Sequence, residues 1–277
     1  RMKNDEMITL AKFLAISGII LPMLPHKNLI PDINLTPYSI WLATVVVSGI
    51  SYLSYLLKRY VFHESGTLVS GIIGGLYSST ATISVLARKS RKASEQEATE
   101  YVAAMLLAVS MMFLRFMILI LIFSREIFLS IYPYLLIMSV VSAIVGWFVH
   151  SRQKLPKDTS VESEEDDSSN PLEFKVALIF AVLFVVFTVL THYTLVYAGT
   201  SGLNLLSFVS GFSDITPFIL NLLQNTGSVA VLIITACSMQ AIVSNILVNM
   251  FYALFFAGKR SKLRPWILGG FGAVIVC

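Results

Sequence analysis

The sequence predicts an all-α, polytopic membrane protein, and three features predict it: the apolar composition, the length of the apolar runs and the placement of the charges. Hydrophobic residues make up 56% of the 277 residues and charged residues 13%, whereas soluble globular domains average about 45–50% apolar and about 25% charged residues. The charges gather in short stretches between runs of about twenty apolar residues, the length of a helix that crosses a bilayer. We therefore expect a lipid bilayer around the chain.

The same features weaken several other classes of protein. The net charge of +4 does not indicate nucleic-acid binding, because Lys and Arg stand at the ends of apolar runs, as topology determinants do. The two cysteines, Cys237 and Cys277, provide neither a disulfide framework nor a cysteine-based metal site. Nothing in the sequence resembles a metal-binding His pair, a nucleophile with its base or a phosphate-binding loop. We expect no enzyme, and no cofactor beyond a bound Na⁺, proton or divalent cation.

Each apolar run is expected to form a helix. The first run ends in Leu21-Pro22-Met23-Leu24-Pro25, which is not a signal-peptide cleavage site, so this helix is predicted to be retained. The last run is too short to cross a bilayer and stops at Cys277; since the chain also begins with Arg1, we expect both ends to continue in a longer polypeptide. The expected helices cover about residues 7–24, 41–57, 67–87, 98–123, 127–149, 176–197, 203–223, 228–257 and 265–277.

The chain is predicted to have four parts. Residues 1–36 form an N-terminal transmembrane helix and loop, residues 37–150 a first repeat, residues 151–171 an acidic flexible linker, and residues 172–277 a second repeat that is cut at its C-terminal end. The linker has too little apolar surface to offset the entropy of ordering it. Its acidic residues stand among serines: Glu162, Glu164, Glu165, Asp166 and Asp167.

The two halves that flank the linker resemble each other. The second apolar segments of the two halves, residues 67–87 and 203–223, align without a gap, and later matches follow in the same order. Each half therefore reads as one copy of a four-segment repeat. The aligned residues are Gly66, Gly75 and Thr80 with Gly202, Gly211 and Thr216.

Loop charge indicates that these second segments enter the membrane and return on the same side. Basic residues lie on both sides of 67–87, and no Lys or Arg flanks 203–223. A crossing segment 67–87 would place one basic flank outside, against the positive-inside bias. With re-entry, each half has three crossings, the second half is inverted, and the N-terminus and linker are cytoplasmic in a prokaryotic inner membrane. The alternative is an ordinary polytopic protein in which each second segment, of about 21 residues, crosses.

Inverted repeats with broken helices are typical of secondary transporters, whose sites lie near the bilayer midplane at the helix breaks. In the first half, Gly74 and Gly75 supply permissive backbone before a run of hydroxyl residues that offer N-cap oxygens. In the second half, Thr216-Pro217 is typical of an N-cap followed by proline at the first helical position. The candidate ion-binding or substrate-binding residues are Ser78, Ser79, Thr80, Thr82, Ser213, Asp214 and Thr216.

Asp214 is the strongest of these candidates. It is the one Asp or Glu in the apolar runs that we place well inside the membrane, where an ionisable group is costly and is a functional candidate by default. It could coordinate a cation, which makes it the candidate metal ligand, or carry a proton. The alternative is that Asp214 only caps the helix that begins near Pro217.

Four further polar residues are weaker candidates for lining a pathway: Arg115, Gln240, Asn245 and Asn249. Arg115 could pair with Asp214, attract an anion, or extend toward the external face. Gln240, Asn245 and Asn249 recur at helical spacing, so this stripe either lines a pathway or hydrogen-bonds to a neighbouring helix.

Several motifs in the chain are shared with one protein family. They are the runs Gly75-Leu76-Tyr77-Ser78-Ser79-Thr80-Ala81-Thr82, Leu86-Ala87-Arg88-Lys89-Ser90-Arg91 and Leu21-Pro22-Met23-Leu24-Pro25, with the pair Gly211 and Asp214. In these motifs, and over nearly its whole length, the chain resembles the C-terminal membrane domain, of unknown function, of MgtC/SapB-type prokaryotic inner-membrane proteins. That resemblance implies a membrane domain that precedes this chain as a partner. In those relatives a second acidic residue often follows the equivalent of Asp214 by two positions; here that residue is Thr216, which weakens a two-carboxylate cation site.

These features together predict a secondary-active transporter of a small ion, a cation with proton coupling, that works by alternating access around paired broken helices. A sodium-coupled small-anion carrier is the first alternative, because the N-termini of the restarted helices favour anions. The paired hydroxyl-tipped segments also resemble the Ser-Asn-Thr hairpins of sodium-coupled dicarboxylate carriers, with Ser79 in place of the Asn. The second alternative is a non-transporting module that regulates or anchors an MgtC/SapB-type partner. Homo-oligomers are compatible with each alternative.

Overall fold

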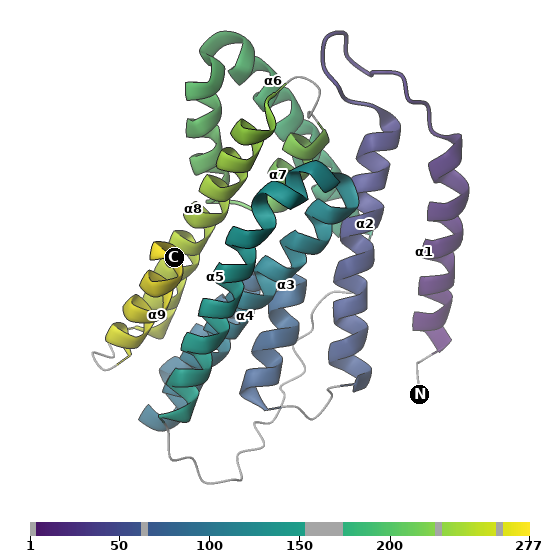
Figure 1. Ribbon diagram of the computed structural model, residues 1–277. Helices are drawn as coiled ribbons and strands as arrows, with labels where there is room; N and C mark the ends of the chain where they lie inside the picture. The colour runs from purple at the N-terminus through teal and green to yellow at the C-terminus, as the bar shows by residue number, and fades with distance from the viewer. Residues whose placement is uncertain (1–3, 62–65, 153–173, 225–228, 259–262) are drawn as a thin grey trace. The chain divides into compact units, whose positions relative to one another are not determined.

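A computed structural model of the chain describes residues 4–61, 66–152, 174–224, 229–258 and 263–277. Within these ranges the chain is almost entirely helical, and β-structure is limited to an isolated bridge between Ile30 and Ile33. Most of the predicted acidic linker lies outside the described residues. The helices, with the π-helical turn η1, are α1 Asn4–Met23, α2 Pro37–Leu56, η1 Leu57–Val61, α3 Thr67–Lys92, α4 Glu95–Phe123, α5 Arg125–Ser151, α6 Phe174–Ser210, α7 Ile215–Gln224, α8 Val231–Ala257 and α9 Arg264–Val276 (Figure 1).

Six helices in the described part of the chain are long and apolar enough to cross a membrane by length and composition. They comprise α2, α3, α5, α8 and most of α4 and α6. This finding confirms the predicted all-α, polytopic membrane protein.

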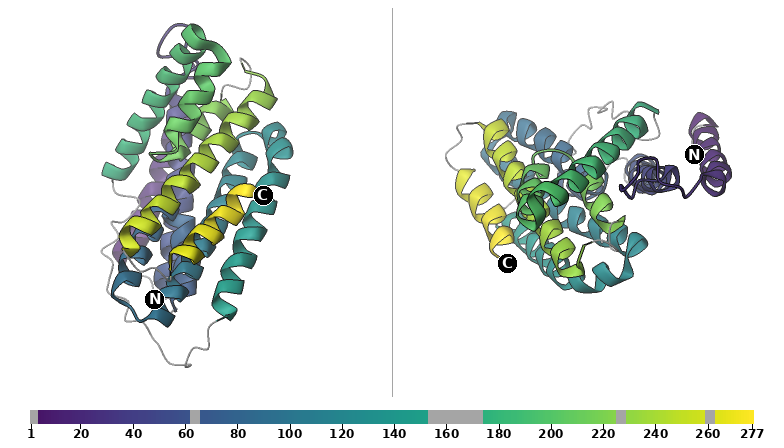
Figure 2. Two further views of the ribbon diagram at one scale, coloured as in Figure 1. Left: turned by 90° about the vertical axis from the view of Figure 1, so that its left-hand side faces the viewer. Right: turned by 90° about the horizontal axis from the view of Figure 1, so that it is seen from above.

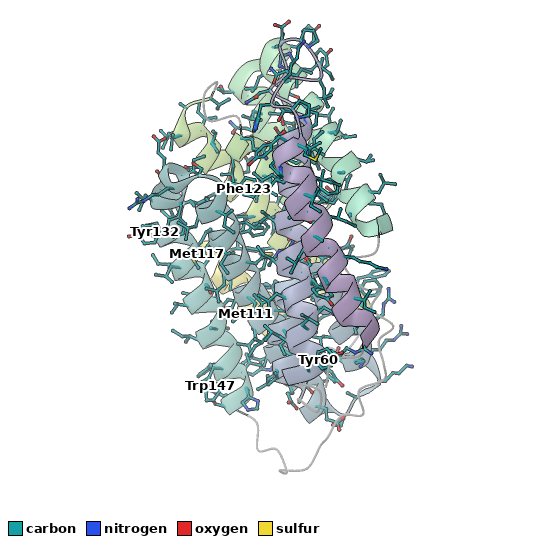
Figure 3. The ribbon with its side chains drawn as sticks, turned by 90° about the vertical axis from the view of Figure 1, so that its right-hand side faces the viewer. Tyr60, Met111, Met117, Phe123, Tyr132 and Trp147 are labelled. Atoms are coloured by element: carbon teal, nitrogen blue, oxygen red, sulfur yellow. The ribbon has the colours of Figure 1, made fainter. Side chains whose placement is uncertain are left out.

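The outer face of α5 has the character of a surface in contact with lipid. Tyr132, Leu136, Val140, Ile144 and Trp147 follow one another at helical spacing, and all of them are exposed. Tyr132 and Trp147 point outward near the two ends of this helix (Figure 3). The separation of fifteen positions between Tyr132 and Trp147 corresponds to about 22 Å along the helix. Aromatic side chains at both ends of an apolar stripe are typical of a helix whose ends meet the two membrane–water interfaces.

The chain divides into two compact units. The first compact unit consists of Arg1–Leu53, Leu119–Ser130 and Ser169–Ile242, and the second of Ser54–Ile118, Ile131–Ser168 and Val243–Cys277. Each unit combines segments from both sides of the linker.

In the second compact unit, three helices pack against α4. Two glycines of α3 lie directly against the α4 backbone, and Gly270 of α9 packs on Leu106. Ser142 of α5 donates a hydrogen bond of 2.7 Å to Leu106 O. Hydroxyl-to-carbonyl bonds and small residues are the usual contacts between membrane helices, because apolar side chains gain little by leaving lipid for protein.

In the first compact unit, α6 turns back on itself at Gly199, as Figure 2 shows. Gly199 has φ +59° and ψ −149°, a backbone conformation that favours glycine. A Cβ at Gly202 would lie 2.8 Å from the side chain of Thr194, although eight residues of a straight helix span about 12 Å. α6 therefore consists of two antiparallel arms, residues 174–198 and 200–210.

Candidate functional site

The first candidate site is the break in α3. Ser78 has φ −157° and ψ 106° inside an otherwise helical segment. A Cβ at Gly74 would lie 2.5 Å from Thr82 Oγ1, whereas these residues would be about 12 Å apart in a straight helix. α3 therefore folds back at Ser78, and neither arm, residues 67–77 or 79–92, has the roughly 20 residues that a crossing needs. The predicted break in this segment is confirmed.

Hydroxyl groups begin the second arm of α3. Ser78 Oγ accepts a hydrogen bond from the Ala81 amide at 3.4 Å, as the predicted N-cap would. Ser79 is buried, whereas Ser78, Thr80 and Thr82 are half-buried. The four predicted residues of this segment thus lie together at the turn, and Thr82 faces Gly74 across it.

The first arm of α3 lies in backbone contact with α4. A Cβ at Gly71 would lie 2.4 Å from Ala104 O, and a Cβ at Gly75 would lie 2.4 Å from Ala108 O. Both pairs are separated by 33 positions, so this arm runs parallel to α4. At these positions only the small side chains of Gly and Ala separate the two backbones.

Arg115 of α4 reaches the end of this first arm. Its Nη1 donates a hydrogen bond of 2.7 Å to Tyr77 O, the last carbonyl before Ser78. The side chain is only 9% exposed, so it is buried rather than extended toward the external face. A guanidinium at this place donates to a carbonyl of the last helical turn and offsets the partial negative charge of the helix end.

The second candidate site lies between α6 and α7. α6 ends at Ser210, and the Ser210 hydroxyl donates a hydrogen bond of 2.7 Å to Ser207 O within the last turn. Tight turns connect residues 208–213, and Ser213 Oγ donates to Ser210 O at 3.1 Å. α7 then begins at Ile215. The predicted break in the second half of the chain is therefore confirmed as well.

Asp214 is the N-cap of α7. Its Oδ1 accepts a hydrogen bond of 2.9 Å from the Thr216 amide, two residues ahead. The expectation that Thr216 is the N-cap and Pro217 the first helical residue is wrong, because the helix begins two residues earlier than Pro217. Pro217 is tolerated there, since amides of the first helical turn have no intrahelical acceptor.

The side chains at this second break differ in exposure. Asp214 and Ser213 are exposed, whereas Thr216 is 2% exposed. The hydrogen bond to Thr216 involves one carboxylate oxygen of Asp214, and the side chain as a whole is exposed. Capping and ion binding are therefore compatible roles for this carboxylate.

Asn221 holds α7 against α6 and was not among the predicted residues. It is 1% exposed, and its Nδ2 donates to Phe187 O and to Thr191 Oγ1, both at 2.9 Å. The rings of Phe187 and Phe218 meet edge to face, with centroids 5.6 Å apart. An amide in the middle of an apolar ten-residue helix was the available signal for this contact.

The remaining predicted residues lie on α8. Asn245 and Asn249 are buried, and Asn249 Nδ2 donates to Asn245 Oδ1 at 3.1 Å within the helix. Gln240 is half-buried. Among the described residues, no group of three or more His, Cys, Asp or Glu side chains could hold a metal ion, so a metal role for Asp214 stays a prediction.

Comparison with known proteins places the chain in a family. A protein of Aquifex aeolicus (strain VF5) with the name "Uncharacterized protein" is 26% identical over 205 residues, which are 73% of this chain and 87% of the relative. No solved structure matches the chain. A family model described as "Domain of unknown function (DUF4010)" matches residues 45–257. The predicted likeness to a domain of unknown function is thus confirmed, while the relation to MgtC/SapB-type proteins stays a prediction. The chain belongs to the DUF4010 family.

Proposed function

We propose that the protein is a secondary-active transporter of a small ion. The ion is a cation, its transport is coupled to protons, and the protein works by alternating access around its two broken segments. The observation that carries this proposal is that α3 and the α6–α7 segment leave helical geometry within apolar runs. Backbone of this kind is tolerated at membrane depth only where protein or a water-filled cavity satisfies it. Such breaks bind substrates and coupling ions in known transporters.

The order of elements supports an inverted repeat. The first half contains α2, the folded-back α3, α4 and α5; the second contains the first arm of α6, the broken α6–α7 segment, α8 and α9. The fold-back at Ser78 supports three crossings in the first half, which would invert the second half. The basic residues on the two sides of the fold-back are Lys58 and Arg59 before α3 and Lys89, Arg91 and Lys92 at its end. With these residues on the cytoplasmic side, the N-terminus is cytoplasmic. The likeness to MgtC/SapB-type proteins favours a prokaryotic inner membrane.

Asp214 is the group that we assign to the cation. It brings an exposed carboxylate to a break between apolar helices, and the Thr216 amide bonds to only its Oδ1. A cation and a proton compete for one carboxylate, because each neutralises it, and this competition couples their movements. The Ser213 hydroxyl is the adjacent neutral oxygen in the same turn.

The test is Asp214→Asn in proteoliposomes that contain the full chain. Asparagine keeps an oxygen that accepts the Thr216 amide, so the cap of α7 is retained while the charge is removed. We expect cation-driven proton flux to fall by about tenfold or more, which corresponds to about 1.4 kcal/mol or more.

Asp32→Asn is the matched control, because Asp32 is exposed in a loop with φ +64°, a conformation that asparagine also adopts. Its flux is expected to equal that of the wild-type protein. Unchanged flux in Asp214→Asn would remove the cation site from the proposal.

A sodium-coupled small-anion carrier is the second candidate, and Arg115 favours it. Among the Arg, Lys, Asp and Glu side chains whose burial the structure describes, only Arg115 is buried. It lies beside the start of the second arm of α3. A positive charge near a helix N-terminus suits an anion. Anion uptake that follows a sodium gradient and survives Asp214→Asn would favour this candidate over the cation.

An MgtC/SapB-type domain that precedes this chain is proposed as a partner on the likeness of motifs alone. Flux from the full chain without that domain would support transport by this domain itself. Absence of flux until the partner is present would favour a regulatory or anchoring role.

A further inference from the structure

The tip of the re-entrant α3 hairpin is tied to α4 at three places. Gly71 and Gly75 touch the α4 backbone along the first arm, and Arg115 Nη1 holds the carbonyl of Tyr77 at its end. The glycine contacts fix the lateral position of the arm. The arginine contact fixes the residue after which the backbone turns.

The parallel register explains why residue 115 can reach that carbonyl. With an offset of 33 positions between facing residues of α3 and α4, Tyr77 lies level with Ser110. Arg115 lies five residues farther along α4, about 7.5 Å beyond that level. Long side chains on a helix point back toward its N-terminus, so the guanidinium arrives at the end of the α3 arm.

The contact has a physical reason in a membrane. The first arm of α3 ends at Ser78 within an apolar run. Carbonyls of the last turn of a helix lie beyond the reach of its regular intrahelical bonds, and at membrane depth the protein itself has to supply their donors. A charged donor makes a stronger hydrogen bond than a neutral one and also offsets the negative end of the helix dipole.

We propose that Arg115 is a positioning residue, which caps the first arm of α3 from the neighbouring helix and so holds Ser78, Ser79 and Thr80 in place for the transported ion. This inference rests on the proposed function for its transport consequence, whereas its structural consequence is independent of transport. Arg115 then acts through the backbone of the hairpin and does not itself touch the ion.

The structural test measures how fast a cysteine at the hairpin tip reacts. Ser79→Cys is introduced in a Cys237→Ser, Cys277→Ser background, where the buried position should react slowly with a membrane-permeant maleimide. Adding Arg115→Met, which has similar length and no charge, should raise the rate about tenfold. Arg115→Lys keeps the charge but has fewer N–H donors than arginine, so it should give an intermediate rate.

Two controls accompany this test. Ser90→Cys, which is buried near the far end of the second arm, should react at the same rate with and without Arg115→Met. Arg125→Met removes an exposed arginine at the start of α5 and should leave the Ser79→Cys rate unchanged. If Arg115→Met does not insert, the lysine variant carries the test alone. Unchanged reactivity at position 79 in each variant that inserts would overturn the inference.

The transport test uses the same variants without the cysteines. A positioning role predicts that Arg115→Met lowers the maximal rate about tenfold with less than a twofold change in KM, and that Arg115→Lys restores part of the rate. A large rise in KM for an anion, with unchanged reactivity at position 79, would instead assign Arg115 to direct anion binding and overturn positioning. If the wild-type protein shows no flux, the proposed function fails while the cysteine test still decides the role of Arg115.

Discussion

Gly75 is the residue whose replacement tests the contact between α3 and α4 most directly. A Cβ there would lie 2.4 Å from Ala108 O and 2.6 Å from Ala108 Cα, both of them backbone atoms that cannot turn away. Gly75→Ala should therefore force the two helices apart and destabilise the protein by about 1–3 kcal/mol, the range for overpacked cores. The midpoint of thermal unfolding in detergent measures this effect.

The matched control for this prediction is Gly272→Ala in α9 of the same compact unit, where a Cβ would meet no atom within 4 Å. Alanine favours a helix over glycine by up to about 1 kcal/mol, so this variant should be as stable as the wild-type protein or more stable. Equal stability of the two variants would contradict the close approach of α3 and α4.

At single residues, the sequence predicted what depends on neighbours along the chain. The break at Ser78 follows from adjacent glycine and hydroxyl residues, whose conformational preferences are local. The bonds from Arg115 to Tyr77 O and from Asn221 to Phe187 O join residues 38 and 34 positions apart, and no local preference specifies which helices meet. The cap of α7 was misplaced because both Asp214 and Thr216 are good caps, and the first one in the chain is used.

At the scale of elements, paired hydroxyls hold α4 and α5 together. Ser110 Oγ donates to Ser139 O at 2.9 Å, and Ser139 Oγ donates to Ser110 O at 3.1 Å, with both side chains buried. Polar contacts between membrane helices contribute about 0.6–2 kcal/mol. A double-mutant cycle of Ser110→Ala and Ser139→Ala, measured as unfolding free energy, should give a coupling energy in this range.

Ser130→Ala is the control for this cycle, because Ser130 is exposed and its Oγ donates within its own helix to Glu126 O. It should change the stability by less than about 0.5 kcal/mol. Strictly additive effects of Ser110→Ala and Ser139→Ala would contradict a shared interaction.

Helix boundaries were predictable to the extent that apolar runs define them. The nine expected segments correspond to nine helices in the described part of the chain, with one difference in division: 203–223 is split between α6 and α7. The turn at Gly199 joins 176–197 to 203–210 within one helical element, because a single glycine with φ +59° allows the reversal without a loop. A sequence read by hydropathy alone does not distinguish such a turn from a continuous helix.

At the scale of the whole molecule, the membrane topology depends on whether the two ends of α3 lie on the same side of the membrane. The fold-back at Ser78 predicts that Gly66, just before α3, and Lys92, its last residue, lie at the same membrane surface. Gly66→Cys has open space around its Cβ, and Lys92 is exposed, so cysteines at both positions should react in a background without the native cysteines. We expect both to react with an impermeant maleimide applied from the cytoplasmic side, because basic flanks favour that side.

The proposed inversion of the second half makes the opposite prediction for the segment that contains Asp214. Ser201 lies at the start of the second arm of α6 and Ala230 follows α7; both are exposed, and no Lys or Arg lies between them. Ser201→Cys and Ala230→Cys should therefore both react from the external side. An inverted repeat predicts that the two positions within each segment react from the same side and that the two segments react from opposite sides. The four labelling rates therefore distinguish an inverted repeat from a chain whose halves share one orientation. Labelling of Gly66→Cys and Lys92→Cys from opposite sides would mean that α3 crosses the membrane, and the three-crossing half on which the proposed transport mechanism depends would be lost.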